Sequence, residues 1–312
     1  ERGSVSNRLF GGEARLSPTR ALTVDGLVMA SEKTGIDAGA AWRAGVQYDP
    51  SVMSYGLSFT SLGKSFKDDL GFVPREGVDI LSGSVLRRIR PKATAAVVRE
   101  FGASVGYNRF SKGGIGTETA TLGPALSVEF NDASRVTFSA LRNEERLSAP
   151  FRPQGIPAGR SIPVGRYTFE NGEVTYQGSN AKRLSPVGGL RFGAFYDGSR
   201  QGWTAGARVR SSEKLAATLT ITRDTVDVPA ATFDTTLVSL RIDGSFSTRM
   251  FANAYVQYNS VARQIVSNVR YDFIHHPLSD LFLVYNETRA TGGSTAPPSR
   301  SFVLKFTQLL SF

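Results

Sequence analysis

Apolar and polar residues alternate one by one along most of this 312-residue chain. Near its end, Phe302, Leu304 and Phe306 fall on one face of an extended segment, and Lys305 and Thr307 fall on the other. A period of two residues is the pattern of a β-strand with one apolar side and one polar side. The same alternation recurs in four further segments, residues 42–49, 203–210, 236–246 and 264–274. No helical period competes over a comparable length, so the sequence predicts an all-β fold.

Short and long turn signals alternate broadly between the strand-like segments. Glycine, proline, asparagine and aspartate dominate both kinds, as turn geometry requires. Short turns are expected at residues 17–20, 49–51, 131–134, 211–214 and 276–279, and long loops at residues 63–77, 146–165, 226–233 and 291–299. About seventeen strands of roughly 9–14 residues result, which is the length of a tilted strand that crosses a hydrocarbon layer.

Two kinds of all-β protein fit this alternation. Soluble sandwiches and propellers usually have shorter strands and connections of similar size. In a membrane barrel the apolar face meets lipid and the polar face lines the lumen. Aromatic residues near strand ends, such as Tyr48, Tyr107 and Trp203, together with the asymmetric loops, favour the membrane barrel. We therefore predict a transmembrane antiparallel up-and-down β-barrel that occupies residues 1–312 without a second domain.

The composition agrees with a barrel in the outer membrane of a Gram-negative cell. Only 40% of the residues are apolar, and no run approaches the roughly 18 apolar residues of a membrane helix. The chain has no cysteine, which suits an envelope protein that folds without disulfides. Its net charge is +10, but the basic residues alternate with threonine, serine and aspartate, so we do not expect nucleic acid as a partner. The expected partners are outer-membrane lipid and lipopolysaccharide.

The last residue of the given sequence is aromatic, and apolar or aromatic residues recur on the same face before it. These residues are Phe302, Leu304, Phe306, Leu310 and Phe312. The pattern resembles the C-terminal signal by which the outer-membrane assembly machinery recognises its barrels. The resemblance implies that these five residues form an assembly signal and that this machinery is a partner.

Four longer strings carry a more specific resemblance. They are residues 66–75 (FKDDLGFVPR), 257–260 (QYNS), 268–270 (NVR) and 276–287 (HPLSDLFLVYNE). In order and spacing they resemble an uncharacterised family of bacterial outer-membrane proteins, in which a family-9-like carbohydrate-binding module precedes a barrel. The resemblance implies an outer-membrane location and implies that only the C-terminal barrel part is present, without the module and the first strands. That family has no established activity.

Strand parity gives a separate reason to expect further strands. If the C-terminus lies in the periplasm, alternating turns place Glu1 outside the cell, and the strand near Asn7–Leu16 runs inward. Bacterial single-chain barrels have even strand numbers. We therefore expect an odd number of further strands between this strand and Ser301–Phe312, from an upstream segment or from another subunit. The alternative is a strand split or missed within Gly155–Gly178. The absence of a leader at Glu1 likewise indicates a processed chain or a fragment.

The sequence offers little for catalysis. The two histidines, His275 and His276, precede a proline in an expected periplasmic turn, with no sign of the nucleophile and orienting acid of a hydrolase. Asp68 and Asp69 supply too few oxygens for calcium. Residues 112–116 resemble a phosphate loop, but no helix follows them, so a hairpin loop is expected. We therefore expect no enzyme, no cofactor and no metal.

Charged residues on the polar face are the candidate functional residues. The expected lumen-lining charges are Arg43, Arg191, Arg208, Arg210, Arg241, Arg270, Lys305, Asp25, Glu129, Asp224, Asp243 and Asp272. Unpaired, they could set an anion preference in a pore. Paired, they would form a cross-strand network that stabilises the register. The network is favoured because acidic residues lie two positions from Arg241 and Arg270.

These expectations rank three functions. The first is a pore or translocation channel for envelope or carbohydrate-type substrates, because the polar face could line a lumen and the resembled family carries a binding module. The second is a structural scaffold barrel within a larger surface complex, held through its long loops. An outer-membrane hydrolase that uses the two histidines comes last.

Overall fold

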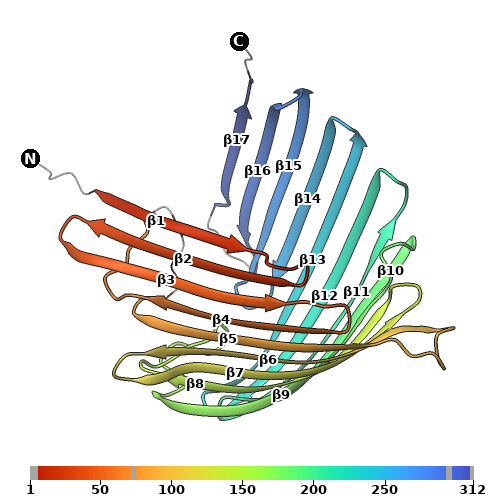
Figure 1. Ribbon diagram of the computed structural model, residues 1–312. Coiled ribbons are helices and arrows are strands. Elements are labelled where there is room, and N and C mark those ends of the chain that lie inside the picture. The colour runs from red at the N-terminus through yellow and green to blue at the C-terminus, as the bar shows by residue number, and fades with distance from the viewer. Residues whose placement is uncertain (1–5, 70, 72, 74, 293–296, 310–312) are drawn as a thin grey trace, which may run out of the picture. The chain divides into compact units, whose positions relative to one another are not determined.

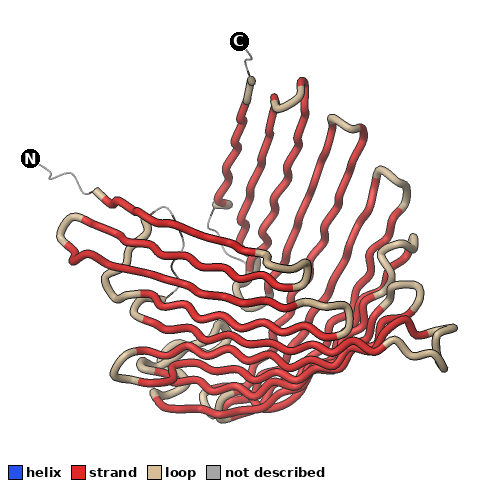
Figure 2. The backbone as a smooth tube through the Cα atoms, viewed as in Figure 1, coloured by secondary structure: helices blue, strands red, loops and turns tan. Residues whose placement is uncertain are grey.

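The computed structural model describes residues 6–69, 71, 73, 75–292 and 297–309. Those residues form seventeen antiparallel strands of one sheet and no helix (Figures 1 and 2). Strands that follow one another in the sequence are neighbours in the sheet. The predicted all-β class, strand count and up-and-down order are confirmed. Among the described residues, no helix is long and apolar enough to cross a membrane.

By its internal contacts the chain divides into two units. Unit 1 holds the strands β1 (Asn7–Leu16), β2 (Leu22–Lys33), β3 (Ile36–Tyr48), β4 (Met53–Leu62), β5 (Val78–Ile89) and β6 (Val98–Lys112). Unit 2 holds β10 (Leu184–Phe195), β11 (Gly198–Arg210), β12 (Leu215–Val228), β13 (Ala231–Ser247), β14 (Met250–Asn259), β15 (Gln264–His276), β16 (Ser279–Ala290) and β17 (Ser299–Phe306). Residues of β7 (Gly116–Phe130), β8 (Arg135–Leu147) and β9 (Gly165–Gln177) are shared between the units.

The ladder registers decide which residues share a face, because residues opposite each other in an antiparallel pair point to the same side. In unit 1, Val28 lies opposite Trp42, and Val46 lies opposite Leu57. The side chains of these residues are exposed although they are large and apolar: Val28 is 64% exposed and Leu57 is 54% exposed. Soluble proteins rarely expose a contiguous apolar surface of this kind.

The opposite face of the same strands is polar. In unit 1 it carries Asp25, opposite Gly45, and Arg43, opposite Thr60. In unit 2 an unbroken series of registers runs from Arg191 in β10 to Lys305 in β17 and keeps the charged side chains together. We call these two sides the apolar face and the polar face of each unit.

The described residues of the loop between β4 and β5 (63–69, 71, 73 and 75–77) lie over the polar face of unit 1. Phe66 is only 3% exposed, and its backbone lies so close to Gly39 that a Cβ there would be 2.2 Å from the Phe66 nitrogen. The Lys67 N–H donates to the Ser31 Oγ at 3.0 Å, and Ser31 lies opposite Gly39 on the polar face. Further along, the Arg75 guanidinium lies 4.5 Å from the centre of the Phe110 ring. The predicted long connection is therefore present, and its described residues lie against the polar face of the sheet.

The connection between β12 and β13 corrects the sequence analysis. A long loop was expected at residues 226–233, but β12 continues to Val228 and β13 begins at Ala231, so a two-residue turn joins them. Val226 and Val228 are buried on the polar face, where Val226 lies opposite Phe233. The ring of Phe233 contacts Gly155 of the loop between β8 and β9. Because these two valines are apolar residues on the polar face, the period-two alternation is interrupted there. The sequence therefore predicts a loop for this segment.

The C-terminal region also differs from expectation. The strand β17 ends at Phe306, and Leu310 and Phe312 lie outside the described residues. His275 and His276 end β15 directly before a turn at Pro277 and Leu278, so the short turn expected at residues 276–279 is present. β1 pairs with β2, and β17 pairs with β16. That further strands lie between β1 and β17 stays a prediction.

Candidate functional site on the polar face

In unit 1 the polar face forms a small polar hollow. The Arg43 Nε donates to the Asp25 Oδ2 at 3.4 Å, and the hollow beside this pair has a volume of about 200 Å³. Its lining includes several glycines and serines. A Cβ at Gly45 would lie 2.8 Å from the Asp25 Oδ1, and one at Gly56 would lie 2.7 Å from the Gln47 Oε1. Small residues thus leave space for the polar side chains of neighbouring strands.

In unit 2 the registers place nine of the sequence-predicted charges on one face. They are Arg191, Arg208, Arg210, Arg241, Arg270, Lys305, Asp224, Asp243 and Asp272. The remaining acid, Glu129, is the penultimate residue of β7 and pairs with Arg135 across the β7–β8 turn. That the charged face lines a lumen stays a prediction.

Several of these charges pair along a single strand. The Arg241 Nε lies 2.9 Å from the Asp243 Oδ1, and the Arg270 Nη2 lies 3.5 Å from the Asp272 Oδ2. In each pair the two residues are two positions apart in the same strand. The Arg270 guanidinium also lies 4.6 Å from the centre of the Phe282 ring. Such partly exposed pairs contribute little stability individually. They do reduce the number of unpaired cations on the polar face.

The most buried charge is Asp224 in β12, whose side chain is 8% exposed. The Arg191 Nε donates to its Oδ1 at 3.1 Å, and the Arg200 Nη2 donates to its Oδ2 at 2.9 Å. The Arg191 Nη1 further donates to the Glu173 Oε1 at 3.3 Å and to the Thr204 Oγ1 at 3.2 Å. A buried carboxylate needs such partners, because its desolvation is otherwise costly. This group is a cross-strand ion-pair network.

A glycine makes this network possible. Gly202 in β11 lies opposite both Arg191 and Asp224, so the two charges meet across the intervening strand. A Cβ at Gly202 would lie 2.1 Å from the Asp224 Oδ1, which is closer than real Cβ contacts. Any larger residue would have to displace the carboxylate from its present place.

A polar cavity of about 440 Å³ adjoins the network. Besides Arg191, Arg200 and Asp224, its lining includes Gln154, Thr222, Thr235, Leu237 and Asn259. Gln154 belongs to the loop between β8 and β9. Near it, Gly155 contacts the Phe233 ring, and the Arg160 Nη1 donates to the Ala230 carbonyl at 3.3 Å. Residues 152–162 of unit 2 thus fold onto the polar face and cover one side of the cavity.

Sequence reasoning missed two residues of this network, Arg200 and Glu173, and it missed Gln154 of the adjoining cavity. Arg200 continues the polar series of Thr204 and Arg208 by period two, but the interpreted segment began at Trp203. Extending the alternating segment by three residues toward the N-terminus would have included Arg200. Glu173 lies in β9, where the strand was doubtful from sequence. Gln154 comes from a loop, whose position no periodicity predicts.

The histidines take part in aromatic packing. The His275 ring stacks on Phe306 with 5.0 Å between ring centres, and it meets His276 edge to face at 5.3 Å. In the described part of the chain, no group of three or more histidine, cysteine or acidic side chains could hold a metal ion. Asp69 pairs with Lys33 at 2.7 Å, and the Asp68 Oδ1 accepts the Gly71 N–H. Residues 113–115 form a hairpin turn between β6 and β7, as expected.

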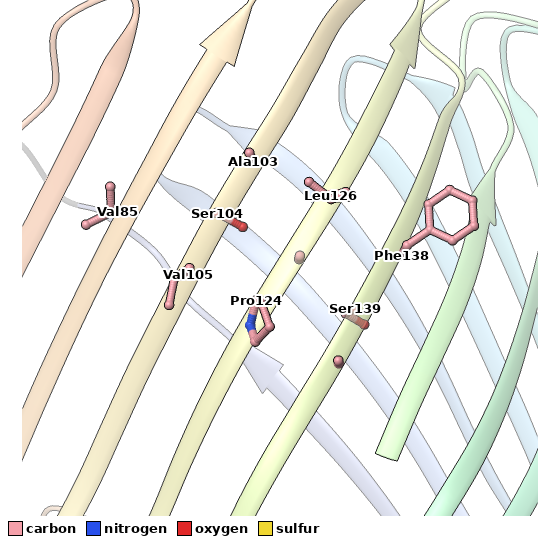
Figure 3. Close-up of a pocket in the computed structure, with 10 residues that line it drawn as sticks. Val85, Ala103, Ser104, Val105, Pro124, Leu126, Phe138 and Ser139 are labelled. Atoms are coloured by element: carbon pink, nitrogen blue, oxygen red, sulfur yellow. The ribbon is translucent and has the colours of Figure 1, made fainter. Parts of the chain in front are cut away.

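The apolar face has a hollow of its own in unit 1. It is lined by Val85, Ala103, Val105, Leu126 and Phe138, which lie on neighbouring strands (Figure 3). Leu126 is 61% exposed. The volume of the hollow is about 490 Å³. Contact of this apolar hollow with hydrocarbon chains is more favourable than contact with a polar solute.

One ion pair joins two turns of unit 2. The Lys182 Nζ, after β9, lies 2.5 Å from the Asp132 Oδ2, in the turn between β7 and β8. The ammonium group and the Ser134 hydroxyl hold the pKa of Asp132 well below its ordinary value, and the carboxylate raises the pKa of Lys182. Both residues lie outside the strands.

No protein-family model matches the chain, and no curated protein gives a significant match. Among solved structures, the chain is similar to the crystal structure of the siderophore receptor PirA from Acinetobacter baumannii. The TM-score is 0.53 at 9% identity, over 96% of this chain and 63% of the receptor chain. A mutant of the ferric enterobactin receptor PfeA from Pseudomonas aeruginosa gives a TM-score of 0.46 at 9% identity, over 96% of this chain and 69% of that chain.

The likeness to PirA defines the class of fold, which is the strand architecture of an outer-membrane β-barrel. At 9% identity it shows the fold alone, and this chain spans 63% of the receptor's length. The resemblance to barrels that follow a carbohydrate-binding module stays an interpretation of the sequence.

Proposed function

We propose that the chain forms the wall of an outer-membrane channel that moves hydrophilic solutes, with the polar face as its lumen. One observation carries the proposal: in each unit the registers place most of the sequence-predicted charges on one face and leave large apolar residues exposed on the other. Lipid solvates the apolar face, and water solvates the polar face. The barrel fold shared with PirA, whose structure is that of a siderophore receptor, supports a transport role.

The proposed solutes are envelope or carbohydrate-type molecules. This finer statement rests on the resemblance of residues 66–75 and 276–287 to barrels that carry a carbohydrate-binding module. The polar hollows of about 200 and 440 Å³ are compatible with hydroxyl-rich solutes, because serine, threonine, asparagine and glutamine occur in their linings. Lipid, lipopolysaccharide and the barrel-assembly machinery are the proposed envelope partners.

Reconstitution tests the channel. The full-length protein, purified from outer membranes and inserted into planar bilayers, is expected to give ion conductance, and loaded liposomes are expected to swell in small sugars. Liposomes that contain the heat-denatured protein serve as the control. A folded preparation, verified by β-sheet circular dichroism, that shows neither conductance nor solute flux would overturn the proposal.

One observation favours a scaffold barrel as the second candidate. Residues 63–77 in unit 1 and residues 152–162 in unit 2 fold onto the polar face, where they narrow the space for a solute. A scaffold would hold partner subunits through other loops. Chemical cross-linking in intact cells, followed by mass spectrometry, is expected to show stable partners if this candidate holds. Recovery of the uncross-linked monomer alone would count against it.

We propose no enzymatic activity. The His275 ring is occupied by stacking on Phe306 and by its edge contact with His276, which leaves it in an aromatic cluster. The likeness to a receptor barrel points in the same direction. Loss of a hydrolase activity on replacing His275 and His276 together would contradict this reading, provided that the variant still assembles.

A further inference from the structure

The network around Asp224 leaves two hydrogen-bond donors unused. Within the described residues, the Arg191 Nη2 and the Arg200 Nε are buried and have no hydrogen-bond partner. Buried guanidinium N–H groups are costly when they lack an acceptor. Both arginines line the 440 Å³ cavity. An acceptor in that cavity would complete their hydrogen bonding.

The resident carboxylate of Asp224 does not accept from these two donors in the structure. Each oxygen of Asp224 already accepts one arginine, Oδ1 from Arg191 and Oδ2 from Arg200. The backbone of Gly202 leaves just enough space for this arrangement, since a Cβ there would lie 2.1 Å from Oδ1. The unused donors therefore call for an oxygen from outside the network.

Asp224 and Glu173 balance the charges of Arg191 and Arg200 within the network, and the wider polar face of β10–β17 favours an anionic acceptor. On the polar face of β10–β17, the strand residues placed by the registers include seven bases, Arg191, Arg200, Arg208, Arg210, Arg241, Arg270 and Lys305. The same face holds four acids, Asp224, Asp243, Asp272 and Asp280. A cationic excess in a low-dielectric wall raises the local concentration of anions. Arginine also matches the planar geometry of carboxylate and phosphate oxygens.

We propose that the cavity of Arg191, Arg200 and Gln154 is a binding subsite for an anionic oxygen group, a carboxylate or a phosphate, carried by a small hydrophilic solute. The two free guanidinium donors bind the oxyanion, and the hydroxyl and amide side chains of Thr222 and Asn259 face the rest of the solute. The subsite deepens the proposed channel function, on which it rests, by naming the charge of the favoured solute.

Calorimetry with simple anions tests the subsite directly. The full-length protein in detergent micelles is titrated with acetate, with inorganic phosphate and with glycerol in a buffer free of other oxyanions. Acetate or phosphate is expected to bind and glycerol is not, and the stronger of the two anions identifies the source of the oxygen group. Absence of binding by both anions at millimolar concentration overturns the proposal.

Two substitutions should move the affinity in opposite directions. Arg200→Gln removes a guanidinium and is expected to weaken anion binding about tenfold, the usual effect of one charge-assisted hydrogen bond. Asp224→Asn removes the competing carboxylate and is expected to strengthen binding. An ion pair with a purely structural role predicts no gain for Asp224→Asn, so an unchanged or weaker affinity overturns the proposal.

The control is Arg223→Gln. Arg223 directly precedes Asp224 in β12 and lies on the apolar face. Arg223 pairs with Asp234 at 2.8 Å and does not line the cavity. Its anion affinity is expected to equal that of the wild type. If Asp224→Asn fails to fold, Gln154→Ala replaces it, because loop substitutions disturb the strands least, and an unchanged affinity for Gln154→Ala counts against the subsite.

Bilayer conductance of the same preparations separates the two proposals. Conductance without anion binding leaves the channel standing and removes the subsite. Anion binding without conductance keeps the subsite and removes the channel.

Discussion

Glycine decides where charges meet on the polar face. Gly202 lies between Arg191 and Asp224, and Gly45 lies beside Asp25. In a sheet, side chains two strands apart are normally separated by the side chain between them. Removal of that side chain lets a long arginine reach across. The position of a glycine thus determines the pairing of residues that are 33 positions apart in the sequence, as Arg191 and Asp224 are.

Gly202→Ala tests this role. The added Cβ would displace the Asp224 carboxylate and weaken its bonds to both arginines, so we expect a loss of about 2–3 kcal/mol in the free energy of unfolding. Urea unfolding in detergent micelles, followed by tryptophan fluorescence, measures it. Gly106→Ala is the matched control, since nothing lies within 4 Å of a Cβ there. Equal stability of the two variants would show that the absence of a Cβ at Gly202 is not required for the bonds of Asp224.

Leu278 holds an unfavourable backbone conformation. Its φ is 60°, in the turn that follows Pro277, and its side chain is 78% exposed. A positive φ costs an ordinary residue about 1–2 kcal/mol relative to glycine, although glycine gives part of this back through the unfolded chain. Leu278→Gly is therefore expected to stabilise the protein by about 1 kcal/mol in the same urea assay. Leu278→Ala keeps the strain and should show no gain; a gain for alanine would point to the exposed side chain as the cause.

The turn pair of Asp132 and Lys182 predicts a pH effect. The pKa of Asp132 lies below its ordinary value of 3.8, chiefly because it accepts from Lys182. A lowered pKa means that the stabilisation is complete above pH 3.8 and is lost as the pH falls through the lowered pKa. In Lys182→Met, the pKa of Asp132 is expected to rise, with Ser134 retaining part of the shift. Carboxyl ¹³C NMR measures it, with Lys214→Met as a control in another turn; an unchanged pKa in Lys182→Met would refute the assignment.

At the scale of strands, period-two alternation predicted most of the fold. The seventeen strands could be predicted because apolar residues at every second position of an extended chain all point to the same face. The alternation failed at Val226 and Val228, which are apolar on the polar face and lie near the loop of residues 152–162. Loop docking is tertiary information. For the same reason Gln154 and the cavity could not be predicted, whereas Arg200 could.

The loop of residues 63–77 should be separable from the sheet by one substitution. Phe66 is buried against Gly39, and Phe66→Ala would lose about 3 kcal/mol of docking free energy. We expect faster cleavage of this loop by trypsin in the folded protein, and a larger single-channel conductance if the polar face lines the lumen. Ile115→Ala changes an exposed residue in the β6–β7 turn and should leave both unchanged. Unaltered cleavage in Phe66→Ala would show that the loop is held by other contacts.

For the whole molecule, the assignment of the faces has one decisive test. Leu57 is on the apolar face and Ser58 is on the polar face, near the middle of β4. An arginine on the lipid side at the bilayer midplane costs about 2–4 kcal/mol, and one on the lumen side costs much less. Leu57→Arg is expected to lower assembly into the outer membrane, measured by heat-modifiable mobility on gels, and Ser58→Arg is not. The reverse order would show that the two faces are inverted.

The same alternation limits how the gene can change in length. Loss or gain of one codon inside a strand would exchange the faces of the residues beyond it in that strand, so a charge such as Arg241 would move to the apolar face and Leu240 to the polar face. Two codons restore the order. Changes inside strands that persist should therefore occur in steps of two, while single steps collect in loops such as residues 63–77. Within a strand, selection is therefore expected to preserve whether the number of residues is odd or even.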